Sequence, residues 1–360
     1  MIEHVFSEAV TSSQGDQNRL KITILGGGSF GTAIANMAAK NGCDTTLWIR
    51  SADVAAQITK TRINAKYLPD FKLDTNLKVS ASLEESVLGC HLILVAIPSH
   101  SFRAILQQIK PYITAQAVIS LTKGIEPDSF CFMSEIIQQE LPEVPYGVVS
   151  GPNLAKEIVA GMPTGTVVAS HSDLVRHAVQ TSLHSAVFRV FASDDIYGVE
   201  LGGALKNIYA IAMGMAAAYN IGENTRSMIL TRALAEMSRF AVKLGANPLT
   251  FLGLSGVGDL FATCNSALSR NYQVGFALGK GKTLDEATKA LGQTAEGVNT
   301  VIQVRKRAAE LDVYMPITNA LYEVIFEQAP ALNMALSLMK NGHRSDVEFV
   351  LPHQHNMSFK

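Results

Sequence analysis

The stretch KITILGGGSFG, at residues 21–31, decides the fold class of this chain. Its first five residues are rich in β-branched side chains and predict a short strand. Gly26, Gly28 and Gly31 follow in the spacing Gly-x-Gly-x-x-Gly, and the apolar residues of 32–40 recur at helical spacing. A strand, a glycine turn and a helix in this order are typical of a dinucleotide-binding turn, with an ordinary glycine turn as the alternative.

Each glycine has a physical task in that interpretation. Gly26 permits the tight turn, Gly28 lets a diphosphate approach the backbone, and Gly31 lets the helix pack closely on the strand. The first turn of the helix adds free N–H groups and the positive end of a dipole, which favour a phosphate. We therefore expect these three glycines to bind a dinucleotide cofactor.

Strand-like and helix-like segments alternate from residue 21 to about residue 196. Residues 92–97 are entirely apolar, as expected for a parallel strand covered on both faces. Ser82 and Glu85 have the spacing of a capping box that opens a short helix. The alternation predicts a Rossmann-type, doubly wound parallel sheet. Further strands are predicted at residues 45–49, 118–121, 147–149, 167–169 and 188–191.

Strand signals nearly vanish after residue 196, so we expect an all-helical C-terminal domain. The stretch 201–218 approaches the length of a membrane span, but Lys206 and Asn207 lie inside it, so a buried central helix is favoured. Helices are predicted at 197–219, 224–244, 284–291, 298–311, 318–327 and 333–339. The expected parts are a polar extension at 1–20, a dinucleotide-binding domain at 21–196, a helical substrate-binding and catalytic domain at 197–342 and a tail at 343–360.

The composition bounds the function classes. Of 360 residues, 48% are hydrophobic and 17% charged, and the formal net charge is −1. This excludes disorder over most of the chain and predicts no general attraction to nucleic acid or to an anionic membrane. The four cysteines form no CxxC pair, so neither a disulfide framework nor a metal site is expected. Scattered cysteines fit a reducing compartment, and residues 1–20 lack the apolar core of a secretory signal, so we expect a cytoplasmic protein.

The end of the second predicted strand bears on the choice of cofactor. An acidic residue there would bind the free ribose 2′-hydroxyl of NAD(H). This chain instead has Arg50, whose guanidinium would pair with the 2′-phosphate of NADP(H). Asp53 is near enough in sequence to serve a ribose hydroxyl, and a solvated surface arginine is the other alternative. We expect NADP(H) to be preferred, with NAD(H) possible.

Lys206 is the strongest indication of catalysis. A lone ammonium inside an apolar helix is costly unless it is paired or functional. Its expected partner is Asp259, in the stretch 256–260 (GVGDL), which predicts a glycine-rich turn. During reduction of a ketone, such an ammonium would stabilise the developing oxyanion and deliver the proton. A purely structural Lys–Asp pair is the alternative.

Further motifs occur along the chain: AIPSH at 96–100, LTKG at 121–124, SGPNLAKE at 150–157, LGGALKN at 201–207, SRN at 269–271 and EG at 296–297. In this order and spacing, residues from about 21 to 340 closely resemble the bacterial-type NAD(P)-dependent glycerol-3-phosphate dehydrogenases. The resemblance implies reversible hydride transfer between NAD(P)H and dihydroxyacetone phosphate, giving sn-glycerol 3-phosphate for glycerophospholipid synthesis. It also implies a small-molecule substrate and a homodimer.

The resemblance implies site residues position by position, with Lys206 as the proton-transferring lysine. Cofactor contacts are implied for Ser29, Phe30, Arg50, Lys123, Ala155, Arg270, Thr294 and Glu296. Substrate contacts are implied for Lys123, Gly151, Asn153, Lys206, Asp259, Ser269, Arg270 and Asn271. Asn153 and Leu154 depart from the family pattern of Ser or Thr followed by Phe. Asn153 is kept because an amide can replace a hydroxyl as a hydrogen-bond donor.

The sequence leaves two other interpretations open. Another two-domain hydroxy-acid dehydrogenase would share the glycine motif and a catalytic lysine, but it would not predict the motifs at 269–271 and 296–297 together. A regulatory protein that senses NADP(H) without turnover would need neither Lys206 nor Asp259.

Overall fold

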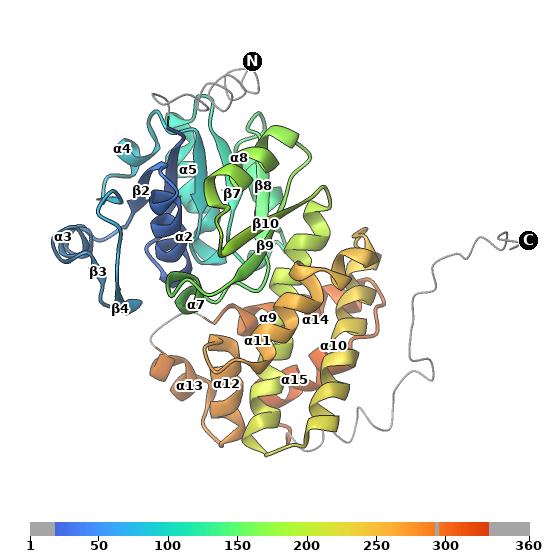
Figure 1. Cartoon of the computed structure of the whole chain (residues 1–360). Coiled ribbons are helices and arrows are strands. Elements are labelled where there is room, and N and C mark those ends of the chain that lie inside the picture. Colours follow the sequence, from blue (N-terminus) through green and yellow to red (C-terminus); the bar gives the residue numbers. More distant parts are fainter. Residues whose placement is uncertain (1–18, 292–294, 331–360) are drawn as a thin grey trace, which may run out of the picture.

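The computed structural model describes residues 19–291 and 295–330. Figure 1 shows two parts, a sheet flanked by helices in blue to green and a group of helices that follows it in sequence. Almost all of the predicted N-terminal extension, the predicted helix at 333–339 and the predicted tail at 343–360 lie outside the described residues.

The sheet has eight strands in the order β10-β9-β8-β7-β6-β1-β2-β5. From β8 to β5, neighbouring strands run parallel. Because the order reverses beside β1, a crevice forms at the carboxyl ends of β1 and β6, and the predicted Rossmann-type fold is confirmed. The bounds are β1 Lys21–Leu25, β2 Asp44–Trp48, β5 Lys78–Ser80, β6 Leu92–Val95, β7 Ala117–Ser120, β8 Tyr146–Ser150, β9 Thr164–Ala169 and β10 Phe188–Ser193.

One part of the prediction was wrong, because the sheet is not parallel throughout. β9 runs antiparallel to β8, and β10 then runs parallel to β9. The link from β8 to β9 contains only the five-residue helix α7 (Ala155–Val159), which is too short to carry the chain back along the sheet as a parallel connection requires. The chain therefore turns back at the carboxyl end of β8 and leaves α7 at that edge.

Alternate side chains of the parallel strands enter two cores, because successive residues of a strand point to opposite faces. Leu94 packs with α2 and α8 on one face, and Val95 packs with α5 and α6 on the other. Ser82 caps α4 as predicted, since its hydroxyl accepts a hydrogen bond from the N–H of Glu85. The bounds are α2 Ser29–Lys40, α3 Ala52–Thr61, α4 Leu83–Val87, α5 Ser99–Ile109, η1 Lys110–Tyr112, α6 Met133–Glu140 and α8 Asp173–Leu183.

A separate hairpin was not predicted. It consists of β3 (Ile63–Asn64) and β4 (Leu68–Lys72), which pair antiparallel. β3 spans only two residues, and β4 carries Pro69, Asp70 and Lys72 rather than an apolar run, so neither has the periodicity of a strand.

The helical part is built around α9 (Ile196–Ala218), which is buried along almost its whole length, as predicted for 201–218. Gly214 on α9 and Gly275 on α12 (Arg270–Gly279) let the two backbones meet, since a Cβ on Gly275 would stand 1.9 Å from the carbonyl oxygen of Ile211. Among the helices that the structure describes, none combines the length and the apolar character of a membrane span. The other helices are α10 Glu223–Lys243, η2 Pro248–Leu252, α13 Leu284–Leu291, α14 Glu296–Glu310 and α15 Pro316–Phe326.

The glycine-rich turn predicted at 256–260 is helical instead. A π-helical turn, η3 (Leu254–Gly258), runs directly into α11 (Asp259–Asn265). A further helix, α12 (Arg270–Gly279), was also missed. Glycines suggested a turn, but Gly256 is required here because a Cβ would stand 2.2 Å from the carbonyl oxygen of Phe251.

Candidate active site

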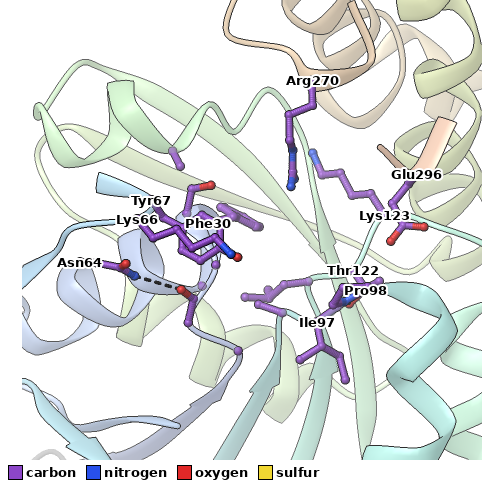
Figure 2. A pocket seen from close by; sticks show the side chains of 18 of the residues that line it. Phe30, Asn64, Lys66, Tyr67, Ile97, Pro98, Thr122, Lys123, Arg270 and Glu296 are labelled. Atoms are coloured by element: carbon purple, nitrogen blue, oxygen red, sulfur yellow. Dashed lines mark hydrogen bonds between the residues drawn. The ribbon is translucent and has the colours of Figure 1, made fainter. Parts of the chain in front are cut away.

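A cavity of about 1060 Å³ lies at the carboxyl ends of the strands and is lined by both parts of the chain. Figure 2 shows Lys123, which follows β7, and Arg270, which begins α12, reaching into it. The predicted site residues that line it are Gly26, Gly28, Ser29, Phe30, Gly31, Arg50, Lys123, Asn153, Ala155, Lys206, Ser269, Arg270, Asn271 and Glu296. Gly151 and Asp259 lie behind this lining and bind Lys123, whereas Thr294 lies outside the described residues.

The glycine loop has the geometry that a diphosphate needs. Gly26 has a φ of +122°, and a Cβ on Gly31 would stand 2.1 Å from the Gly26 carbonyl oxygen, so neither position accepts a larger residue. By contrast, a Cβ on Gly28 would meet nothing within 4 Å, so the backbone there borders open space. Gly28 precedes α2, whose first turn has no side-chain cap and no acidic residue. These residues therefore fit a dinucleotide, with its diphosphate at the start of α2.

Arg50 and Asp53 differ in their relation to the cavity. Arg50 is exposed and lines the cavity just after β2, beside Ser51 at the start of α3. Asp53 lies in the first turn of α3 and is not part of the lining. The end of β2 therefore brings a cation rather than a carboxylate to the cavity.

Lys206 is held on the cavity wall by two partners from α11. Its Nζ lies 2.5 Å from Asp259 Oδ1 and 2.6 Å from Thr263 Oγ1. Lys206 is only 6% exposed and Asp259 only 1%, yet Lys206 still lines the cavity. The predicted contact between Lys206 and Asp259 is present, and it holds Lys206 on the wall of the cavity that the glycine loop also lines.

Lys123 shares the same carboxylate. Its Nζ lies 2.6 Å from Asp259 Oδ2 and 2.7 Å from the carbonyl oxygen of Gly151. Burial lowers the pKa of Lys123 to about 8, although Asp259 acts in the opposite direction. Two ammonium groups therefore meet one carboxylate, and this wall of the cavity carries an excess of positive charge that favours an anion or a developing oxyanion.

The start of α12 forms a second polar wall. The Ser269 hydroxyl caps the helix by accepting from the N–H of Tyr272, and Arg270 extends into the cavity (Figure 2). Asn271 Oδ1 accepts a hydrogen bond from the N–H of Gly297 at 3.0 Å. The side-chain nitrogen of Asn271 is therefore the group that can donate to a ligand. A guanidinium and an amide so placed can donate several hydrogen bonds to a phosphate.

Glu296 crosses from α14 to the sheet part. Its carboxylate accepts from both the N–H and the hydroxyl of Ser99, at 3.1 and 2.6 Å, and so caps the start of α5. Figure 2 labels Glu296 at this wall together with Lys123, Thr122 and Pro98. Glu296 thus lines the cavity while tying the two parts of the chain together.

Asn153 offers a different hydrogen-bonding group from the one expected. Its amide nitrogen donates to Thr166 Oγ1 at 3.0 Å, while its Oδ1 has no partner among the described residues. The hydroxyl of Ser150, the last residue of β8, is also buried and has no partner in the part of the chain that the structure describes. The donor expected from the sequence is thus bonded within the protein, and the Asn153 oxygen is a buried acceptor.

Several lining residues were missed by sequence reasoning. Thr263 binds Lys206 and lies four residues after Asp259 on α11. In a helix this spacing places two side chains on the same face, but a turn was expected before Thr263. Asn207 lines the cavity and adjoins Lys206, but its amide gave no sequence signal of its own. Lys66 and Tyr67 enter from the unpredicted hairpin. Within the described ranges, no group of three His, Cys, Asp or Glu side chains is arranged to hold a metal ion.

Comparison with known families gives a consistent match over both parts. Residues 21–175 match the model described as the NAD-dependent glycerol-3-phosphate dehydrogenase N-terminus, and residues 195–335 match the model of its C-terminus.

Relatives and solved structures agree with that match. The glycerol-3-phosphate dehydrogenase [NAD(P)+] of Acinetobacter baylyi is 76% identical over 334 residues, 93% of this chain and 94% of its own length. The protein of the same name from Acinetobacter baumannii (strain SDF) is 73% identical over 98% of this chain and 99% of its own length. The crystal structure of glycerol-3-phosphate dehydrogenase from Coxiella burnetii has a TM-score of 0.86 and 35% identity, covering 89% of this chain and 99% of that one.

Proposed function

The chain belongs to the NAD-dependent glycerol-3-phosphate dehydrogenase family, and on that premise we propose that it interconverts dihydroxyacetone phosphate and sn-glycerol 3-phosphate with NAD(P)(H). The observation that carries the proposal is the Lys206 ammonium, held by Asp259 and Thr263 on the wall of the cavity. In the direction of reduction, the product supplies the glycerol backbone for glycerophospholipid synthesis.

The cofactor would lie along the glycine loop. Gly26 and Gly31 shape the turn, Gly28 leaves room at the backbone, and the uncapped start of α2 faces the diphosphate. Ser29, Phe30 and Ala155 line the same cavity and would contact the dinucleotide. When bound, the reduced nicotinamide supplies the hydride that forms the new C–H bond.

Lys206 would supply the proton. As the carbonyl π bond breaks, charge builds on the ketone oxygen; the Lys206 ammonium stabilises it and then transfers a proton from Nζ, which forms the alcohol O–H bond. Asp259 keeps the ammonium oriented before transfer through its 2.5 Å contact. In the oxidation, the neutral amine takes the hydroxyl proton back.

The other charged groups would position the substrate. Lys123 adds a second cation near the same oxygen end, held by Asp259 and Gly151. Arg270 and Asn271, with Ser269 at the helix start, would bind the phosphate, since a guanidinium and an amide offer several donors. Asn153 lines the cavity beside Lys123 and would border the substrate there.

We further propose that NADP(H) is preferred over NAD(H). Arg50 supports this, since it lines the cavity at the end of β2 where the ribose 2′ position lies in this fold. The division into a cofactor domain at 21–196 and a substrate domain at 197–342 is proposed with it, as are a homodimer, to be checked by light scattering, and a cytoplasmic location. The four cysteines, all unpaired, support a reducing compartment.

A substrate panel tests the activity. The purified protein should oxidise NADPH with dihydroxyacetone phosphate and show no comparable rate with 2-keto acids. A preference for 2-keto acids would instead indicate a hydroxy-acid dehydrogenase. NADPH binding without turnover of any substrate would indicate a sensor.

The role of Lys206 has its own test. Lys206→Ala should lower kcat about 10²- to 10⁴-fold, the usual effect of losing a general acid, while NADPH binding remains. Lys206→Arg is the matched control: it keeps the positive charge beside Asp259, but its guanidinium does not give up a proton, so its kcat should stay low. Full activity in either variant would contradict the assignment.

A further inference from the structure

The β3–β4 hairpin is hydrogen-bonded to the glycine loop. Asn64, at the end of β3, is 1% exposed and donates both to the Gly27 carbonyl oxygen and to Thr32 Oγ1, each at 2.9 Å. The hairpin loop closes with a hydrogen bond from the Tyr67 N–H to the Asn64 carbonyl oxygen at 3.1 Å. These bonds fix the loop residues between Asn64 and Tyr67 beside the start of α2.

The base of the hairpin is fixed as well. The N–H of Leu73 donates to the Arg62 carbonyl oxygen at 2.7 Å, and the N–H of Asp74 donates to Asn36 Oδ1 on α2 at 2.7 Å. Both ends of the hairpin are therefore tied to one another or to α2. The hairpin loop is therefore an ordered part of the cavity wall.

Lys66 is the charged residue of that loop. It is exposed, lines the cavity and makes no ion pair with a carboxylate of residues 19–291 or 295–330. Its Nζ lies 5.3 Å from the centre of the Tyr67 ring. Figure 2 shows Asn64, Lys66 and Tyr67 on the same side of the cavity as Phe30.

The charges of this wall suit one chemical group. The start of α2 offers N–H groups and the positive end of a dipole, with no acidic side chain in its first turn. Lys66 follows Asn64 by two residues, and consecutive Cα atoms are about 3.8 Å apart, so its ammonium can reach the space in front of Gly27 and Gly28. The start of α2 and Lys66 both border the cavity, so two positive features are available for the two negative charges of a diphosphate bridge.

We propose that Lys66 binds the diphosphate of the dinucleotide, with Asn64 as the residue that positions it. This inference rests on the proposed function, since it places the cofactor at the glycine loop. It assigns Lys66 a task different from that of Arg50, which is to distinguish NADP(H) from NAD(H). Lys66 would serve both cofactors equally, because both carry the same diphosphate.

Isothermal titration calorimetry on the full-length protein tests this, with NADH, NADPH and ADP-ribose as probes. Lys66→Gln should raise the Kd of all three by the same factor, about five- to twentyfold, as expected for one charge-assisted hydrogen bond. The effect should shrink at high salt, because the ammonium is exposed. Lys72→Gln is the matched control, since Lys72 is an exposed lysine of the same hairpin that does not line the cavity.

The outcomes separate cleanly. An unchanged Kd in Lys66→Gln overturns the role of Lys66. A loss confined to NADPH also overturns it, because Lys66 would then serve the 2′-phosphate. Equal losses in Lys72→Gln would show a general effect of charge and overturn it too. If the unchanged protein binds none of the three probes, the proposed function itself fails, together with this inference.

Discussion

Replacing Asp259 with asparagine should expose how much the two lysines depend on one carboxylate. The change keeps the shape of the side chain, but it leaves the ammonium groups of Lys206 and Lys123, now 2.5 and 2.6 Å from the carboxylate, facing a neutral amide. Removing one partner from a buried ion pair costs about 3–5 kcal/mol. The folded chain can instead release a lysine proton, which from a reference pKa of about 10.4 costs about 4.6 kcal/mol at pH 7.

The two routes give similar costs, so the free energy of unfolding of Asp259→Asn should fall by about 3–5 kcal/mol at pH 7. The second route also predicts a pH dependence. Asp259 raises the pKa of Lys123, which burial lowers to about 8, so without Asp259 this pKa falls further. Where the unfolded chain binds a proton that the folded chain has released, stability rises with pH. This rise in stability with pH begins near pH 8 in the unchanged protein and at a lower pH in Asp259→Asn.

Urea unfolding at pH 6, 7 and 8, followed by circular dichroism, measures both effects. The deficit of Asp259→Asn should shrink by about 1 kcal/mol between pH 7 and pH 8. Thr263→Val is the control, because it removes a neutral partner of Lys206 and should cost about 1 kcal/mol at every pH. Parallel pH curves for Asp259→Asn and the unchanged protein would refute the reasoning, since the loss would then not come from charge.

Three other predictions concern separate parts of the molecule. Burial raises the pKa of Glu200 to about 7, so between pH 4.5 and 7 the folded chain binds a proton that the unfolded chain lacks. Stability should therefore fall by up to about 3 kcal/mol as pH rises through this window, and Glu200→Gln should remove that slope in urea titrations. Gly31→Ala should lower the melting temperature, because its Cβ would stand 2.1 Å from a carbonyl oxygen, whereas Gly28→Ala should leave it unchanged and weaken NADPH binding alone. Arg50→Gln should raise the Kd of NADPH about tenfold in calorimetry with little effect on NADH; equal losses would exclude a 2′-phosphate contact.

The fold was predictable where local sequence decides it. The glycine loop could be predicted because Gly26 is required by the turn itself and Gly31 by a contact with Gly26, five residues earlier. The contact between Lys206 and Asp259 was predictable for another reason: a charge inside an apolar helix requires a partner, and Asp259 lies in a stretch with few other charges.

What depends on distant parts of the chain was not predictable. The reversed direction of β9 follows from a short connection after β8, which a periodic pattern does not encode. The hairpin is stabilised by Asn64 bonding to Gly27 and Thr32, more than thirty residues earlier in the sequence, so its short strands carry no signal of their own. Thr263 became part of the site only because the expected turn before it is helical.

The pairing of Lys123 with Asp259 has a consequence for engineering. Lys123 follows a strand of the sheet part, whereas Asp259 begins a helix of the helical part. A chimaera that joins the first half to a foreign helical partner would inherit an amine without its counter-ion, unless the graft brings an acid to the same spot. The two parts are therefore not interchangeable modules, because the interface between them depends on a specific ion pair as well as on the continuous chain.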